Sequence, residues 1–129
     1  WAFKKDTNDT RESAAINVAD YLLNEQANVT VYDPRVKEKQ IVNDLLYLKS
    51  RSIEEINKGV SVFDDPYEVC KGAHAIAILT EWDEFKDYDW KKIYDNMKKP
   101  AFIFDGRNIL DAKKIKEIGF HFNAIGRED

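Results

Sequence analysis

At 129 residues, with 43% hydrophobic and 34% charged residues, the chain has the length of one globular domain and is too rich in apolar residues to be disordered. Its 20 basic and 24 acidic residues are interspersed and give a net charge of −4, which excludes a broad basic field for nucleic-acid binding. The longest apolar run, residues 75–79, is far shorter than the roughly 20 residues that span a bilayer. We therefore expect a soluble, cytoplasmic domain without nucleic-acid or membrane partners.

The N-terminal segment combines a short apolar stretch with a helix-start pattern. Residues 1–3 are apolar and lead directly into charged residues, as expected for the end of a strand whose first part is missing. Asp9 and Glu12 have the spacing of a capping box, which predicts that a helix begins there.

Three cations surround this predicted helix start: Lys4, Lys5 and Arg11. Free N–H groups, the helix dipole and the cationic side chains would all favour a phosphate at such a place. The alternative is a capped surface helix with solvated lysines. No glycine lies between Phe3 and Arg11, so the turn that brings a backbone close to a dinucleotide pyrophosphate is missing, and the segment is a poor site for NAD alone.

Beyond this segment, patterns typical of helices and strands alternate along the chain. Residues 49–59 form a polar stretch without a clear element. In chain order we predict a helix over 14–23, a strand over 29–32, a helix over 36–48, a strand over 60–63, a helix from Pro66 that Gly72 ends, a strand over 75–79, a helix over 89–97, a strand over 101–104, a helix over 110–118 and a strand over 119–125. The two apolar strands over 75–79 and 101–104 are expected to be buried on both faces. The alternation predicts an α/β fold, a doubly wound, mostly parallel, six-stranded Rossmann-like sheet with helices on both faces.

Ligands of such sheets bind at the carboxyl ends of the strands. Lys4, Thr80 and Arg107 each follow a predicted strand directly or within three residues, so we expect them along one edge. A lysine point charge and a planar arginine donor suit a phosphate. The alternatives are a capping and packing role for residues 80–82, and a plain turn at Gly106 with a solvated arginine.

Other reactive residue types have ordinary structural explanations. Cys70 has no histidine or second cysteine at nucleophile or metal spacing, so we expect an inert thiol. His74 and His121 also lack partners at metal spacing, and no metal site is expected. Asp33 follows a strand, where dinucleotide folds carry a ribose-binding acid, but the missing glycine turn argues against that role.

Several long motifs resemble, in the same order, the C-terminal domain of the UDP-glucose 6-dehydrogenase family, within the UDP-glucose/GDP-mannose dehydrogenases. The resemblance covers nearly the whole chain, and residues 35–59 are its least distinctive part. The motifs are residues 2–13, 31–34, 65–75, 80–83 with Phe85, and 99–107. It implies that residues 1–129 are a single UDP-sugar-binding domain of a larger dehydrogenase subunit, with a truncated first strand.

The resemblance also implies roles for individual residues. Phe3, Lys4 and Arg107 match positions that contact the UDP-sugar, and Arg11 matches an arginine that reaches NAD, which the missing N-terminal domain mainly binds. The family's catalytic cysteine lies in a Gly-Phe-Gly-Gly-Ser-Cys-Phe type motif that this chain lacks, so we expect no catalytic residue here. The parent would oxidise UDP-glucose to UDP-glucuronate by two hydride transfers to NAD, through a cysteine-linked intermediate.

Two other functions remain open, and the sequence argues against a third, a receiver-like regulatory module. The domain could belong to a dehydrogenase of another nucleotide sugar, such as UDP-N-acetylmannosamine or GDP-mannose. It could be a purely structural oligomerisation domain; the resemblance implies a homo-oligomer, in this family a hexamer. A receiver-like regulatory module would need a lysine after the fifth strand, where this chain has residues 105–107, Asp-Gly-Arg.

Overall fold

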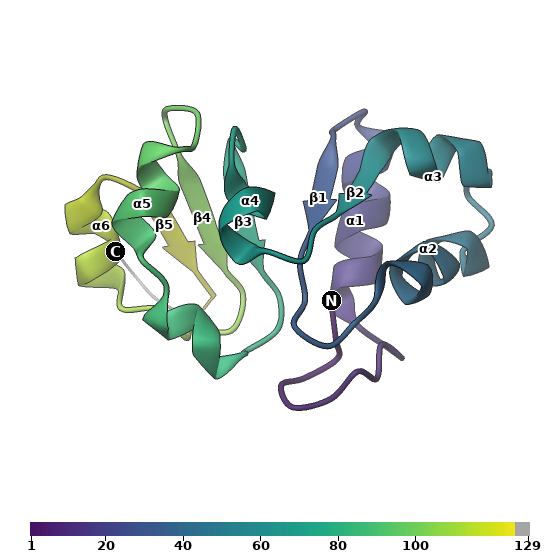
Figure 1. The fold of residues 1–129 in the computed structure, drawn as a ribbon, viewed down its shortest axis with the longest axis horizontal. Coiled ribbons are helices and arrows are strands. Elements are labelled where there is room, and N and C mark those ends of the chain that lie inside the picture. The colour runs from purple at the N-terminus through teal and green to yellow at the C-terminus, as the bar shows by residue number, and fades with distance from the viewer. Residues whose placement is uncertain (126–129) are drawn as a thin grey trace. The chain divides into compact units, whose positions relative to one another are not determined.

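The computed structural model describes residues 1–125, and the chain divides into two compact units, Trp1–Val69 and Cys70–Asp129 (Figure 1). The boundary falls within helix α4. Unit 1 contains α1 (Ala14–Asn24), β1 (Val29–Val31), α2 (Glu38–Tyr47), α3 (Ile53–Gly59), β2 (Val60–Val62) and most of α4 (Pro66–Cys70). Unit 2 contains β3 (Ala75–Ile78), the 3-10 helix η1 (Asp83–Asp87), α5 (Trp90–Asp95), β4 (Phe102–Asp105), α6 (Ala112–Ile118) and β5 (His121–Ala124).

All described strand pairs are parallel. In unit 1, β1 pairs with β2, and Val29 lies opposite Val60. In unit 2, β4 lies between β3 and β5, and Phe102 lies opposite both Ala75 and His121. The predicted alternation of helices with parallel strands is therefore confirmed. The predicted six-stranded sheet is wrong, because the described strands form one sheet of two and one of three.

Residues 1–3 explain the difference in strand number, since they form no strand. The backbone N–H of Ala2 donates to the Asp33 carboxylate at 3.0 Å, and that of Phe3 donates to the carbonyl of Asp9 at 2.8 Å. These donors are therefore engaged by a side chain and a local loop, and they do not extend a β-ladder.

Two helices supply the centre of the unit 1 core. Ile41 and Leu45 of α2 and Ile56 of α3 are completely buried. Helix α2 packs on α3, and α3 also contacts β2. Burying each of these side chains stabilises the fold by about 1.5–3 kcal/mol.

Helix α3 was not predicted, although its start carries a clear signal. The Ser52 hydroxyl accepts a hydrogen bond from the N–H of Glu55 at 3.2 Å, and the Glu55 carboxylate accepts one from the N–H of Ser52 at 3.0 Å. This reciprocal capping box satisfies two donors at the start of the helix. The polar stretch over 49–59 therefore becomes a helix through its cap and one buried isoleucine.

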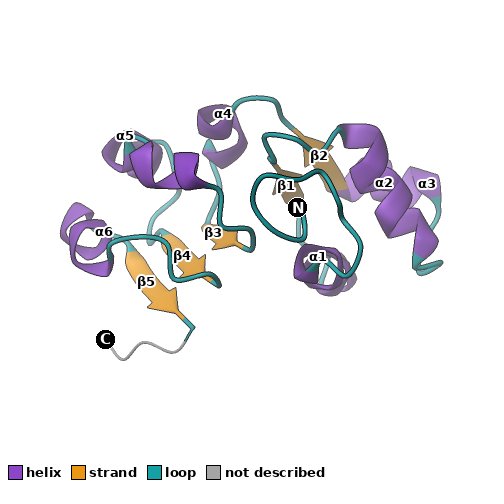
Figure 2. Ribbon diagram, turned by 90° about the horizontal axis from the view of Figure 1, so that it is seen from below, coloured by secondary structure: helices purple, strands orange, loops and turns teal. Residues whose placement is uncertain are grey.

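The three-stranded sheet of unit 2 carries helices α5 and α6 on one side (Figure 2). Ile103 and Phe122 point into this packed side, together with Ile93 of α5 and Ile115 of α6, and all four side chains are buried. Parallel sheets gain stability mainly from such apolar burial.

The other side of the same sheet remains accessible in the described part of the chain. Ala75 and Ala77 are exposed, and the Phe104 side chain is 49% exposed. Side chains alternate between the two faces of a strand, and α5 and α6 cover only one of them. The prediction that β3 and β4 are buried on both faces is therefore wrong for this chain.

Two aspartates and one glycine mark helix ends in unit 2. The Asp89 carboxylate accepts from the N–H of Lys92, and the Asp111 carboxylate accepts from the N–H of Lys113, each at 3.1 Å. Gly119 ends α6 with a φ of +129°, and a Cβ at that position would lie 2.7 Å from the Tyr94 ring. Only glycine fits this turn without displacing Tyr94.

The helices of the described chain are short. The longest, α1, has 11 residues, and none combines the length and apolar character that crossing a membrane requires.

Candidate functional site

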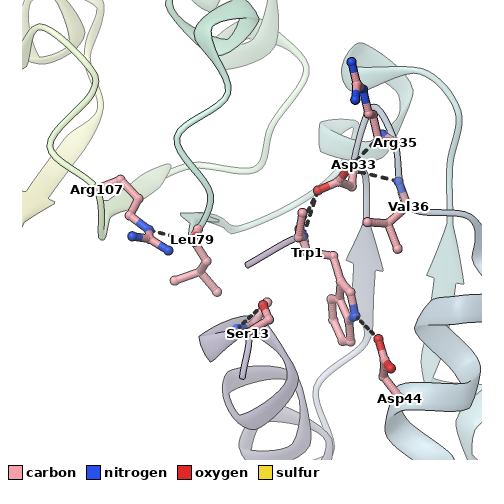
Figure 3. A network of polar contacts seen from close by, with 10 residues as sticks. Trp1, Ser13, Asp33, Arg35, Val36, Asp44, Leu79 and Arg107 are labelled. Atoms are coloured by element: carbon pink, nitrogen blue, oxygen red, sulfur yellow. Dashed lines mark hydrogen bonds and ion pairs between the residues drawn. The ribbon is translucent and has the colours of Figure 1, made fainter. Parts of the chain in front are cut away.

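In unit 2, Arg107 lies at the carboxyl ends of β3 and β4. Its Nε donates to the carbonyl of Leu79 at 3.0 Å, and its Nη1 lies 3.3 Å from a carboxylate oxygen of Glu81 (Figure 3 shows the first contact). Thr80 lies between these two residues in sequence and is buried. The structure thus brings Arg107 to the strand end that Thr80 follows, as predicted. The guanidinium is not a freely solvated group, and its side chain is 36% exposed.

Asp105 organises the loop that carries this arginine. Its carboxylate is 1% exposed and accepts the N–H groups of Arg107 at 3.0 Å, Ile109 at 2.8 Å and Leu110 at 2.9 Å. A Cβ at Gly106 would lie 3.1 Å from the carbonyl oxygen of Ile78, which is tight. The buried carboxylate and the glycine together set the direction in which Arg107 leaves the sheet.

Phe3, Lys4 and Arg11 belong to a loop of unit 1. The hydrogen bond from the Phe3 N–H to the Asp9 carbonyl closes this loop, and Phe3 is 41% exposed. Lys4 is exposed, and its charge contributes to lowering the pKa of Asp9. Because Lys4 lies in unit 1 and both Thr80 and Arg107 in unit 2, their common edge stays a prediction.

The predicted helix start at Asp9 is wrong. Helix α1 begins at Ala14, and its N-cap is Ser13, whose hydroxyl accepts the N–H of Ala15 at 3.3 Å. Glu12 has a φ of +63°, which is incompatible with a helical turn at that residue. The predicted anion site, with Arg11 at a helix start capped by Asp9, is therefore not formed.

Asp9 instead pairs with Arg11. The Arg11 guanidinium contacts the Asp9 carboxylate through Nε at 3.0 Å and Nη2 at 2.8 Å, and the Arg11 N–H donates to the same carboxylate at 3.0 Å. The Arg11 side chain is nevertheless 88% exposed. These contacts lower the pKa of Asp9 from its ordinary value of 3.8 to about 2, with the side-chain hydrogen bond as the largest cause.

Removing this guanidinium gives the first prediction. In Arg11→Ala, we expect the pKa of Asp9 to rise from about 2 toward 3.8, stopping short of it because the backbone hydrogen bond from residue 11 remains. The chemical shift of the Asp9 carboxyl carbon, followed by NMR from neutral pH downward, measures this change. A matched Lys39→Ala variant should leave Asp9 unchanged, and equal midpoints in wild type and Arg11→Ala would contradict the pairing.

Asp33 anchors the segment that follows β1. One carboxylate oxygen accepts the Trp1 nitrogen at 2.9 Å and the Ala2 N–H at 3.0 Å. The other accepts the N–H of Arg35 at 2.8 Å and of Val36 at 3.1 Å (Figure 3). Burial raises the pKa of Asp33, but hydrogen bonds from the backbone N–H groups of Ala2 and Arg35 oppose this effect, and the pKa lies below its usual value. The carboxylate serves backbone donors, which argues against a ribose-binding role.

The structural roles of Asp33 and Asp105 were missed in the sequence, although they share a signal. Asp33 lies two residues after β1 and Asp105 ends β4, and in each case an arginine stands two residues later, as Arg35 and Arg107. In both cases the aspartate accepts the backbone N–H of that arginine, at 2.8 and 3.0 Å. An acceptor of this kind, two residues before the donor, is the usual side-chain turn of aspartate.

Neither a metal centre nor an activated thiol is present in the part of the chain that the structure describes. Among residues 1–125, no three His, Cys, Asp or Glu side chains are placed to hold a metal ion. Burial raises the pKa of the Cys70 thiol to about 11, so the reactive thiolate is scarce at neutral pH.

The chain matches the UDP binding domain of the UDP-glucose/GDP-mannose dehydrogenase family over residues 1–112. It is 53% identical to UDP-glucose 6-dehydrogenase 1 of Glycine max, an alignment that covers 98% of this chain and 28% of that protein. It is 50% identical to the UDP-glucose 6-dehydrogenase of Drosophila melanogaster, covering 99% of this chain and 27% of the relative. The chain thus spans little more than a quarter of the length of these relatives.

A solved structure agrees with this assignment. The NDP-N-acetyl-D-galactosaminuronic acid dehydrogenase of Methanosarcina mazei Go1 superposes with a TM-score of 0.76 and 28% sequence identity, covering 99% of this chain and 23% of that one. Together with the match over residues 1–112, it shows that the chain belongs to the UDP-glucose/GDP-mannose dehydrogenase family, in which it corresponds to the UDP binding domain.

Proposed function

We propose that residues 1–129 form the UDP-sugar-binding domain of an NAD-dependent UDP-glucose 6-dehydrogenase, which oxidises UDP-glucose to UDP-glucuronate in two hydride transfers. The observation that carries this proposal is the identity of 50–53% to UDP-glucose 6-dehydrogenases of a fly and a plant over almost the entire chain. The isolated chain would bind part of the substrate and would not catalyse the reaction.

The geometry of Arg107 supports a contact with the UDP phosphates. The Arg107 backbone N–H donates to Asp105, its Nε donates to the Leu79 carbonyl, and its guanidinium lies beside the Glu81 carboxylate, so the group is held at the strand ends while its side chain stays partly exposed to a ligand. In the proposal, the Lys4 ammonium adds a second positive charge, and the partly exposed Phe3 ring contacts the UDP-sugar. Each charge-assisted hydrogen bond to phosphate would contribute about 1.5–3 kcal/mol.

NAD would be held mainly by the rest of the subunit. The loop over 3–11 contains no glycine, and Arg11 is its one residue with a proposed NAD contact, already paired with Asp9. These residues do not by themselves form a dinucleotide site. In the proposal, Arg11 only contributes a charge to a cofactor bound elsewhere.

The proposal also includes the setting of the domain. The domain would contact the N-terminal and central parts of the same subunit. The subunits would form a homo-oligomer, which by family resemblance is a hexamer, and the protein would be located in the cytoplasm. The two compact units would act together as one domain. Sedimentation of the full-length protein measures its oligomeric state. A fully active protein that sediments as a monomer would contradict the proposed homo-oligomer.

The substrate-binding role is tested by Arg107→Ala in the full-length dehydrogenase. We expect KM for UDP-glucose to rise about tenfold, because a guanidinium contact to phosphate is lost while the fold is kept. Lys4→Ala should produce a smaller rise, about threefold, because a flexible exposed ammonium contributes less. NADH formation at varied UDP-glucose measures both effects.

The control variant is Lys113→Ala, which removes an exposed cation of α6 in the same unit and should leave KM unchanged. Unaltered kinetics in both Arg107→Ala and Lys4→Ala would refute the site assignment. Comparing UDP-glucose with UDP-N-acetylmannosamine and GDP-mannose as substrates separates the proposal from the other nucleotide-sugar dehydrogenases, and a preference for either alternative would overturn it.

A further inference from the structure

A concave surface of unit 1 gathers cationic and amide side chains. The cavity has a volume of about 290 Å³, and none of its described lining residues is acidic. Its polar lining consists of three cations and three amides: Arg35, Lys37, Lys39, Asn8, Gln40 and Asn43. Because the whole chain has a net charge of −4, this cluster is a local concentration of positive charge and not part of a general basic surface.

Hydrogen bonds at both ends of Arg35 hold this residue in place beside the cavity. Its N–H and that of Val36 both donate to the Asp33 carboxylate, and Val36 is buried. At the other end of the residue, Nη1 donates to the carbonyl of Asp6 at 3.3 Å. Little further ordering of Arg35 is therefore needed when a ligand binds, which lowers the entropic cost.

The start of α2 adds backbone donors to the same surface. Its N-cap is Lys37, and no side chain caps the helix. The Lys37 carbonyl accepts from the N–H groups of Gln40 at 3.0 Å and Ile41 at 3.2 Å, whereas the first-turn N–H groups of Glu38 and Lys39 have no acceptor within the described chain. Uncapped N–H groups at the start of a ten-residue helix favour a negative charge.

We propose that this cavity, defined by Arg35, Lys37 and Lys39, binds the phosphate group of a small anion. Arg35 supplies a planar guanidinium that also donates to the Asp6 carbonyl, and the two lysines supply charge. The Asn8 and Asn43 amides and the uncapped N–H groups complete the coordination, whereas the Gln40 amide already donates to Asp44. The volume is at the lower limit for ligand cavities and suits a phosphate or diphosphate better than a whole dinucleotide. The site goes beyond the proposed UDP-sugar contacts, since it uses none of Phe3, Lys4 or Arg107.

Inorganic pyrophosphate is the probe that tests this site. In an NMR titration of the chain at low salt, we expect saturable shifts of the Asn8, Glu38 and Lys39 backbone amides. Arg35→Gln and Lys37→Gln should each weaken the affinity by about fivefold or more. The matched control is Lys58→Gln, which removes an exposed cation of α3 in the same unit and should change the affinity by less than about twofold.

Three outcomes would overturn the proposal. One is the absence of saturable shifts at these amides, and another is equal weakening by Lys58→Gln, which would show diffuse attraction by surface charge. If Arg35→Gln disturbs the loop, the double variant Lys37→Gln/Lys39→Gln still tests the site, because both lysines are exposed and their replacement should leave the fold intact. Retained affinity in this double variant would also refute the site.

Discussion

Replacing Asp33 with alanine is expected to destabilise unit 1 by roughly 3–4 kcal/mol, a large share of the 5–15 kcal/mol that stabilises a typical domain. The carboxylate accepts four hydrogen bonds, from Trp1, Ala2, Arg35 and Val36. Its removal takes away this acceptor from the N–H groups of Ala2 and Val36, which both belong to buried residues. Urea unfolding followed by circular dichroism measures the loss.

The matched control is Asp64→Ala, which removes an exposed carboxylate of the same unit and should shift the free energy of unfolding by less than about 0.5 kcal/mol. Asp33→Asn should recover only part of the stability. The asparagine side chain keeps one accepting oxygen, and its NH₂ group would face backbone donors in place of the second oxygen. A loss in Asp33→Ala no larger than in Asp64→Ala would refute the anchoring role.

Acid supplies an independent test of the same carboxylate. The pKa of Asp33 is lowered in the folded protein, so its ionised form contributes stability that is complete above the unfolded value of about 3.9. That contribution is lost as the pH falls through the lower folded pKa. Wild type should therefore lose more stability between neutral and acidic pH than Asp33→Asn does, and parallel pH profiles would contradict this assignment.

The elements of both units could be predicted from the sequence wherever apolar spacing decides them. Helices α1 and α2 and the five strands were located to within a few residues by this spacing. Their pairing could not be predicted, because sheet order depends on contacts between distant residues. The composition of residues 1–3 predicts a strand. In the structure, however, the N–H of Ala2 donates to the distant Asp33 carboxylate, and the N–H of Phe3 donates to the carbonyl of Asp9 in the following loop.

Local polar chemistry was the harder part to predict. Asp9 and Glu12 have the spacing of a capping box, but Arg11 between them offers a charged partner, and Asp9 pairs with it. The true cap is Ser13. At Ser52 and Glu55 the same spacing does form the box. A capping pattern is therefore reliable only where no closer charge competes for its carboxylate.

The position of Arg107 could be predicted because strand ends alone determine it. Residues that follow neighbouring parallel strands must meet at one edge, and Arg107 does contact Leu79 and Glu81 there. The buried acceptor beneath it could not be predicted in the same way. The sequence shows Asp105 only as a polar residue at the end of a strand. The structure shows that three backbone N–H groups donate to its carboxylate.

Asp105→Ala is expected to cost about 3 kcal/mol and to release the loop that carries Arg107. Three backbone N–H groups lose a buried charged acceptor, and that of Leu110 belongs to a buried residue. Hydrogen exchange locates the effect: the amides of Ile109 and Leu110 should become unprotected, while the β4–β5 ladder keeps its protection.

The exposed carboxylate of Asp87, in the same unit, provides the comparison, and Asp87→Ala should alter neither stability nor the exchange of these amides. Asp105→Asn should fall between wild type and Asp105→Ala, since one oxygen still accepts while the NH₂ group opposes the remaining donors. If Arg107 owes its direction to Asp105, both Asp105 variants should also lower affinity for UDP-glucose in the full-length protein, although the Arg107 side chain is intact. Protected amides at Ile109 and Leu110 in Asp105→Ala would show that the loop holds its shape without this carboxylate.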